Sequence, residues 1–102
     1  MGLFYIMGLD RKALSLERAR RLRLIRERIH KIKSQQQMAA ALGVPYQTYN
    51  NWERGHQIPV NEAKRIKEAT PGLTEDYLLW GDIDALAADL LRKMKSRASP
   101  SP

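Results

Sequence analysis

The stretch Gln35–Arg54, QQQMAAALGVPYQTYNNWER, decides the fold. Gly43 follows an apolar and alanine run, where a chain leaving a helix often needs a positive φ that glycine adopts without a Cβ clash. Ala39 falls on the same helix side as Met38 and Leu42, so its small side chain lets a second helix pack closely. The stretch therefore predicts two short helices that cross at a tight turn.

The second predicted helix has an apolar back and an amide-rich front. At about 100° per residue, Tyr49 and Trp52 share one face. The opposite face gathers polar residues, namely Gln47, Asn50, Asn51 and Arg54. Asn and Gln present a donor beside an acceptor, which matches the edge of adenine in the DNA major groove. This is the layout of a helix-turn-helix, and it favours a front that reads bases over one that is merely solvated.

A capping signature marks the start of the first helix of this pair. Ser34 and Gln37 have the S-x-x-Q spacing, in which the hydroxyl accepts from a backbone N–H and the Gln side chain reaches back. The N–H groups of this first turn, at the positive end of the helix dipole, also suit a phosphate oxygen. Gln35 could add a side-chain donor to that contact, and a purely structural cap is compatible with it.

These motifs, with Ile58 and Pro59 opening the next helix and TEDYLLWGD at residues 74–82, resemble the phage-repressor and Cro-like helix-turn-helix proteins, the Xre family. The resemblance covers roughly Ala19 to Asp82. It implies an all-α protein with a five-helix lambda-repressor-like DNA-binding domain, to which this chain adds a C-terminal amphipathic helix. The partner that it implies is a double-stranded DNA operator.

The resemblance also implies roles for single residues. The base-reading positions of the family hold Tyr46, Gln47 and Asn51, and its backbone-contacting positions hold Gln35, Thr48 and Arg54. Family members often turn the position of Asn50 toward solvent, so a role for Asn50 does not follow. The family often pairs an Arg of its first helix with the Glu of a W/L-E-x-G motif, which implies a structural pair of Arg28 with Glu53.

The chain departs from the family pattern at the start of the recognition helix. Pro45 stands where many relatives have a Ser or Thr cap, so this helix begins with the preset φ of proline and no side-chain acceptor. Tyr46 is aromatic where relatives are more often polar, and it could contact a thymine methyl, touch a phosphate, or pack against the turn. The junction 32–34 also lacks the usual Gly-hydrophobic-Ser/Thr-Gln signature.

The pattern divides the chain into four parts. Residues 1–14 are an N-terminal arm, which could be disordered, clasp a second chain, or lie upstream of a true start at Met7. Residues 15–82 are the DNA-binding domain, with the helix-turn-helix at 35–54. Residues 83–95 form the amphipathic C-terminal helix, and the polar, proline-rich residues 96–102 form a disordered tail.

Within the domain, Ser15 opens a first helix that we expect to run to about Lys33. Its apolar stripe consists of Leu22, Ile25, Ile29 and Ile32. The fourth helix begins at Pro59, presents an apolar face of Ala63, Ile66 and Ala69, and ends at Pro71 and Gly72. Thr74 caps a fifth helix that Gly81 ends, and we expect this helix to close the core with Tyr77, Leu78 and Trp80.

From Ile83 to Met94, apolar residues recur at spacings of three and four, as in an amphipathic helix. This stripe could pack back on its own domain or meet its copy in a second chain. The second arrangement makes a homodimer, which suits a reader of two half-sites about 34 Å apart.

Composition limits what else the chain can do. Its 102 residues, 43% of them hydrophobic, build one modest core. With no Cys, and with His30 and His56 far apart, we expect no disulfide, metal or cofactor. The apolar N-terminal run is too short to span a bilayer and no basic residue precedes it, so we expect a cytoplasmic protein without a membrane partner.

The net charge of +7 is unevenly distributed. Residues 10–33 hold ten Lys and Arg against three acids, residues 34–91 four against eight, and residues 92–102 four against none. Basic flanks attract phosphate without regard to base sequence. In the first helix, Arg18, Arg20, Arg21, Arg23 and Arg26 are equally compatible with direct phosphate contact and with a solvated face.

Two functions of different classes fit these features. The first is a sequence-specific DNA-binding regulator, a repressor of phage or bacterial type that occupies an operator. The second is an interaction module on the same fold, such as an antitoxin, whose helices mainly hold a protein. The polar front of the recognition helix favours the first. An enzyme is not expected, because no catalytic constellation or phosphate-binding loop is present.

Overall fold

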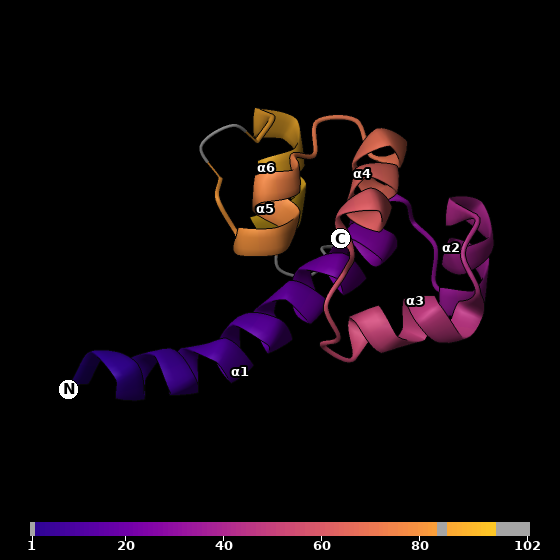
Figure 1. Ribbon diagram of the computed structural model, residues 1–102. Coiled ribbons are helices and arrows are strands. Elements are labelled where there is room, and N and C mark those ends of the chain that lie inside the picture. Colours follow the sequence, from indigo (N-terminus) through magenta and orange to yellow (C-terminus); the bar gives the residue numbers. More distant parts are fainter. Residues whose placement is uncertain (1, 84–85, 96–102) are drawn as a thin grey trace.

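The computed structural model describes residues 2–83 and 86–95, with side chains from residue 11 onward, and every regular element in these ranges is a helix. The elements are α1 (Gly2–Leu24), the π-helical turn η1 (Ile25–Ile29), α2 (Gln35–Leu42), α3 (Tyr46–Glu53), α4 (Val60–Ala69), α5 (Glu75–Trp80) and α6 (Ala88–Lys95) (Figure 1). None of the described helices has both the length and the apolarity to cross a bilayer.

The turn between α2 and α3 has the predicted conformation. Gly43 is left-handed, with φ 75°. Its N–H donates to Ala40 O at 3.1 Å, and the N–H of Val44 donates to Ala39 O at 3.0 Å, so two carbonyls at the end of α2 are satisfied. At the other end of α2, the Ser34 hydroxyl accepts from the Gln37 N–H at 3.2 Å. Both predicted ends of this helix are therefore confirmed.

One hydrophobic core joins the helices. α1 and η1 contribute Leu22 and Ile25, and α3 contributes Tyr49 and Trp52, whose ring centroids lie 6.0 Å apart, edge to face. The other helices and loops add Met38, Ala39, Leu42, Ile58, Ala63, Ile66, Leu73, Tyr77 and Leu78. Two predictions about apolar residues are wrong. Ala69, predicted on the apolar face of the fourth helix, is exposed in the last turn of α4. Trp80, expected to close the core, is the last residue of α5 and is 66% exposed.

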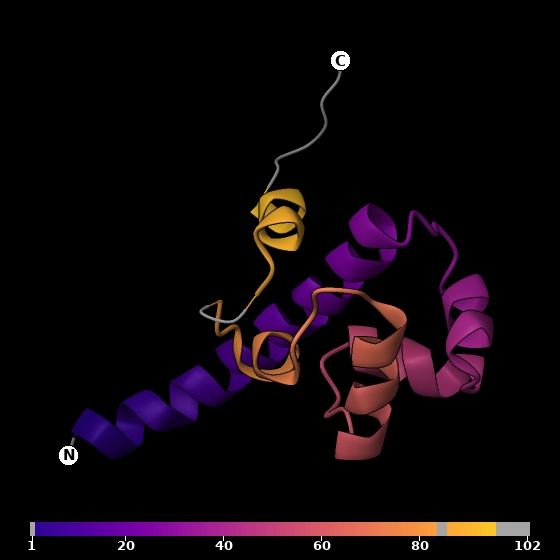
Figure 2. The same ribbon diagram turned by 90° about the horizontal axis from the view of Figure 1, so that it is seen from above.

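The first helix is longer at its start and shorter at its end than predicted. α1 begins at Gly2 rather than Ser15, since no proline interrupts the preceding residues. In both views the N-terminal half of α1 projects away from the other helices (Figures 1 and 2). The end comes before Lys33, because η1 widens the last turn and Lys31 takes the left-handed φ of 59°.

The C-terminal helix packs back on its own domain. α6 begins at Ala88, later than the predicted Ile83, and Ile83 itself is 44% exposed. Leu90 and Met94 of α6, with Leu86 before it, are buried in the core, where α6 packs against η1. The apolar stripe is thus used within the chain. The predicted disordered tail, residues 96–102, lies outside the described residues.

Candidate nucleic-acid interface

The outer face of α3 is polar and open. Gln47 is exposed, Tyr46 is 44% exposed, and Arg54, just after the helix, is exposed. Thr48 and Asn51 are partly exposed. The face exists because Tyr49 and Trp52 anchor the opposite side of the helix in the core, which fixes the rotation of α3 about its axis. Five of the six predicted contact residues lie here.

Two of the predicted base-reading residues are already joined. The Nε2 of Gln47 donates to the Oδ1 of Asn51 at 3.2 Å, one helical turn away. The bond does not use the Asn51 amide N–H groups or the Gln47 carbonyl oxygen. Paired amides of this kind present donors and acceptors together, which suits a base edge.

The start of α3 has no side-chain cap, as the sequence predicts. Pro45 occupies the N-cap with φ −63° and ψ 145°, and no side chain accepts from the first-turn N–H groups. These donors remain at the positive end of the helix dipole, beside the exposed Tyr46. The start of α3 can therefore accept a phosphate oxygen or another anionic group.

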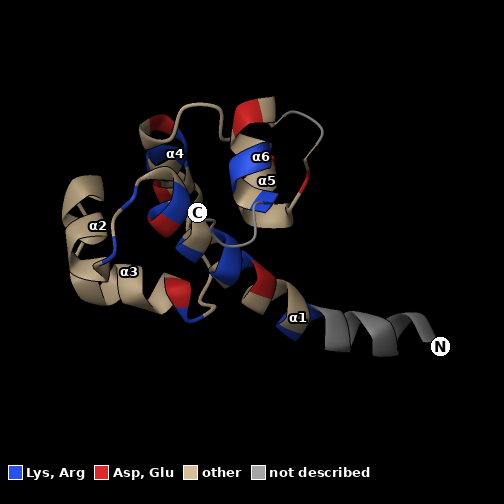
Figure 3. Cartoon of the chain, turned by 180° about the vertical axis from the view of Figure 1, so that it is seen from behind, with Lys and Arg blue, Asp and Glu red and all other residues tan. Residues whose placement is uncertain are grey.

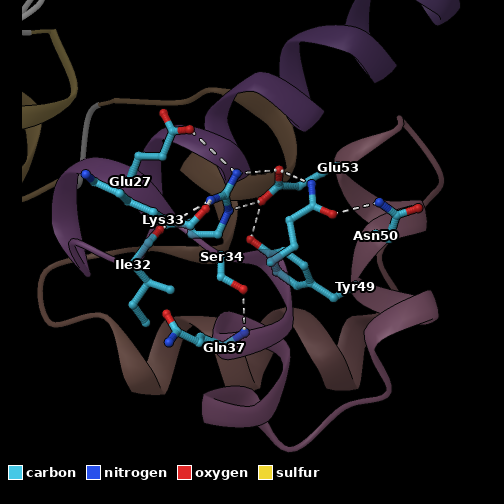
Figure 4. A network of polar contacts seen from close by, with 10 residues as sticks. Glu27, Ile32, Lys33, Ser34, Gln37, Tyr49, Asn50 and Glu53 are labelled. Atoms are coloured by element: carbon cyan, nitrogen blue, oxygen red, sulfur yellow. Dashed lines mark hydrogen bonds and ion pairs between the residues drawn. The ribbon is translucent and has the colours of Figure 1, made fainter.

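The side chain of Gln35 points toward α3. Its Oε1 accepts from Asn50 Nδ2 at 2.7 Å, and its Nε2 donates to Glu53 Oε1 at 2.9 Å (Figure 4). The sequence left the role of Asn50 open. In the structure Asn50 binds the Gln35 side chain and so helps to join α2 to α3. Gln35 therefore ties the first turn of α2 to α3, and its backbone N–H is left at the helix start for a ligand.

Glu53 is the centre of this network. Its carboxylate accepts from Arg26 Nε at 2.7 Å, from Arg26 Nη2 at 3.1 Å and from the Tyr49 hydroxyl at 2.5 Å. The side chains of Arg26 and Glu53 are only 5% and 3% exposed. The hydrogen bond to Glu53 raises the pKa of Arg26, whereas burial, followed by the neighbouring carboxylate, raises the pKa of Tyr49. Arg26 is thus held charged, and the Tyr49 hydroxyl keeps the proton that it donates to Glu53.

The partner of Glu53 is Arg26, and the pair of Arg28 with Glu53 that the family resemblance implied is wrong. Arg26 follows Leu22 by four residues, so it lies on the buried face of the helix, and its Nη1 also donates to the carbonyls of Ile32 and Lys33. Arg28 lies two residues further round, and its Nη1 donates to Met94 O of α6 at 3.1 Å. The direction of each arginine depends on η1, which sequence spacing does not reveal.

Five arginines of the predicted first helix were expected either to contact phosphate or to be solvated. Three of them instead donate hydrogen bonds to other parts of the protein. Besides Arg26, Arg18 donates to Gly55 O at 3.0 Å, and Arg21 donates to Leu78 O at 3.2 Å, with its Cζ 5.8 Å from the Tyr77 ring centroid. Arg20 and Arg23 are exposed. Arg18 and Arg21 therefore tie α1 to the loop after α3 and to α5.

Charge surrounds the helix-turn-helix rather than covering it. Figure 3 shows α2 and α3 almost without charged residues, and the one charged residue inside them is the buried Glu53. Lys31 and Lys33, in the segment that leads into α2, are exposed, as is Arg54 after α3. We expected the first helix to run to about Lys33, so both lysines were predicted to lie inside it. They were therefore not predicted as candidates for phosphate contact at the start of α2.

Comparison with known proteins gives one match. A family model described as helix-turn-helix matches residues 22–78, which run from the end of α1 into α5. No curated protein and no solved structure matches the chain. Over the residues whose side chains are described, no three His, Asp or Glu side chains gather as a metal site would require.

Proposed function

Because the chain belongs to the helix-turn-helix family of the Xre and Cro type, a family of DNA-binding regulators and not of enzymes, we propose that it is a sequence-specific transcriptional repressor of phage or bacterial type. It occupies an operator by placing α3 in the major groove. The observation that carries this proposal is the outer face of α3, where linked amide side chains are exposed on a helix whose back is fixed in the core.

The contact residues divide into two groups under this proposal. Tyr46, Gln47 and Asn51 read base edges, and the bond between the two amides makes Gln47 and Asn51 read as a unit. Thr48 and Arg54 contact the sugar-phosphate backbone, as does the first turn of α2. There the backbone N–H of Gln35 makes the contact, since its side chain is held by Asn50 and Glu53.

The proposal includes a homodimer that acts in the cytoplasm on two half-sites about one helical turn apart. Since the stripe of α6 is buried within its own chain, the dimer contact uses another surface. Sedimentation of the free protein and of its complex with a two-half-site duplex measures the number of chains per operator. If only one chain binds each operator at saturating protein, the homodimer is contradicted. The proposal that α3 reads bases would still stand.

A pair of substitutions tests the readout. Gln47→Ala should lower affinity for the operator by about 1–3 kcal/mol and relax the preference at one base pair, with little loss on a scrambled duplex. Arg54→Ala should weaken both duplexes alike and reduce the salt dependence by about one phosphate contact. The operator is first obtained by selecting bound fragments of the source genome, and affinities are then measured by fluorescence anisotropy.

The two duplexes also define the result that would contradict the proposal. If Gln47→Ala weakens the operator and the scrambled duplex equally, Gln47 does not read bases. If the unsubstituted protein binds both duplexes equally, the chain is not a sequence-specific regulator.

A further inference from the structure

A pocket of about 370 Å³ lies outside the helix-turn-helix, between α1, the loop that follows α3 and the end of α5. The side chains that matter for its chemistry are Arg11, Leu14, Ser15 and Arg18 of α1, Gln57 of the loop and Trp80 of α5. Arg11, Ser15 and Arg18 follow one another at spacings of four and three residues, so they share one face of α1. The pocket thus combines a polar helix face with an exposed indole.

The charge of the pocket is positive. Two guanidinium groups line it, and none of its lining residues with a described side chain is a carboxylate. The Nη2 of Arg18 is held by Gly55 O at 3.0 Å, which fixes this side chain at the wall. Its Nε is buried and has no hydrogen-bond partner. A buried donor without an acceptor is costly, so an anionic or carbonyl-like group that reached this guanidinium would stabilise it.

The protonation of Arg18 agrees with this. Burial lowers the pKa of Arg18, because the charged guanidinium is partly withdrawn from water. A phosphate oxygen would offset that desolvation with a charge-assisted hydrogen bond. The Ser15 and Gln57 side chains that line the pocket carry further donors, and Leu14 and Trp80 add apolar surface that suits a deoxyribose.

The position of the pocket identifies the source of the phosphate. Gly55 and Gln57 follow α3 within a few residues, so the pocket is continuous with the end of the recognition helix. The N-terminal half of α1 and α3 both lie along the lower edge of the molecule in Figure 1. A duplex that receives α3 along this edge brings its backbone toward α1.

We propose that this pocket binds the sugar-phosphate backbone of the duplex that α3 reads, next to the segment whose bases are read. The inference rests on DNA binding by α3 and extends it with a second, sequence-independent contact made by α1. Arg11 supplies an exposed charge and Arg18 the charge that Gly55 O holds in place, while Trp80 packs on the sugar. The contact lengthens the footprint and adds affinity on every sequence alike.

Arg11→Gln tests the proposal, with Lys12→Gln as a matched control. Both side chains are exposed neighbours on α1, but only Arg11 lines the pocket. Arg11→Gln should weaken a selected operator and a scrambled duplex of equal length by the same factor. Its salt slope should fall by about 0.9, so that the loss of affinity between 50 and 200 mM salt is about 3.5-fold smaller. Lys12→Gln should change the affinity and the salt slope by no more than about half as much as Arg11→Gln does.

A second variant and a footprint separate the pocket from diffuse charge. Trp80→Ala removes an exposed side chain, so the fold should persist, and it should weaken both duplexes without changing the salt slope. Ethylation of single phosphates should interfere with binding at one backbone position beside the read segment. That interference should disappear with Arg11→Gln and remain with Lys12→Gln.

Two results would overturn the inference. Equal effects of Arg11→Gln and Lys12→Gln would show that only overall charge matters. Unchanged DNA binding by Arg11→Gln and Trp80→Ala, with a change in the concentration dependence of sedimentation, would show that the pocket holds a second copy of the chain. The proposed function fails separately, when the unsubstituted protein does not distinguish the operator from the scrambled duplex.

Discussion

At the scale of single residues, Glu53 connects three helical segments. Its buried carboxylate accepts from Arg26 of η1, Gln35 of α2 and Tyr49 of α3. Taking two charges out of water is costly, and good geometry with further hydrogen bonds is what offsets the cost. Here both carboxylate oxygens have at least two donors, and the third nitrogen of Arg26 reaches two carbonyls. The network therefore fixes the angle between α2 and α3.

Glu53→Gln should destabilise the protein by about 3–5 kcal/mol, because it leaves the Arg26 charge buried without its counter-ion. Glu27→Gln is the control, since Glu27 contacts the same arginine at 3.6 Å but its side chain is 45% exposed. It should change the free energy of unfolding by less than about 1 kcal/mol. Urea unfolding followed by circular dichroism measures both, and equal losses would contradict the role given to Glu53.

At the scale of elements, α2 and α3 approach closely because the residues between them are small. Ala39 is 2% exposed at their crossing, and Gly43 turns the chain with the φ of 75° that most side chains resist. Neither residue has a polar side chain. Both set where the outer face of α3 lies relative to the start of α2.

Ala39→Leu should cost about 1–3 kcal/mol of stability, since the added side chain overpacks the crossing and pushes the two helices apart. It should also weaken operator binding more than binding to a scrambled duplex, because base readout needs the exact angle of α3 while phosphate attraction does not. Ala40→Leu, one residue along and exposed, is the matched control. A fully stable Ala39→Leu protein with unaltered operator preference would contradict this account.

At the scale of the whole molecule, the domain is closed from its C-terminal side by α6. Leu90 and Met94 cover η1, and the Met94 carbonyl accepts from Arg28. The match to the helix-turn-helix family ends at residue 78, so this closure lies beyond the segment that the family model covers. The chain uses its last described helix to complete a core that α1 to α5 leave open beside η1.

Leu90→Ala should therefore lower the stability of the whole domain by about 2–5 kcal/mol, as for a buried leucine elsewhere. Leu16→Ala is the control. Because Leu16 is 57% exposed, this substitution should change the free energy of unfolding little. Both are measured by urea unfolding at two protein concentrations tenfold apart. If the effect of Leu90→Ala depended strongly on concentration, α6 would stabilise an association of chains rather than its own domain.

The sequence predicted well where the cause is local. Ser34 and Gly43 bound α2, Thr74 and Gly81 bound α5, and Tyr49 and Trp52 are the back of α3, since a cap, a left-handed glycine and a helical period act within a few residues. It predicted poorly where the cause is distant. Nothing near Trp80 shows that the core ends before it, and nothing near Arg26 or Arg28 shows which of them reaches Glu53.

By itself, then, the sequence determined the helix-turn-helix and the residues that its second helix turns outward, because a periodicity and two helix-ending signals act along a short length of chain. Only the tertiary structure decided that Arg26 rather than Arg28 reaches Glu53, that Gln35 binds Asn50, and that α6 packs inward. These outcomes depend on the π-helical turn η1 and on which surfaces remain uncovered once the other helices have packed. Both are properties of the assembled core and not of any one segment.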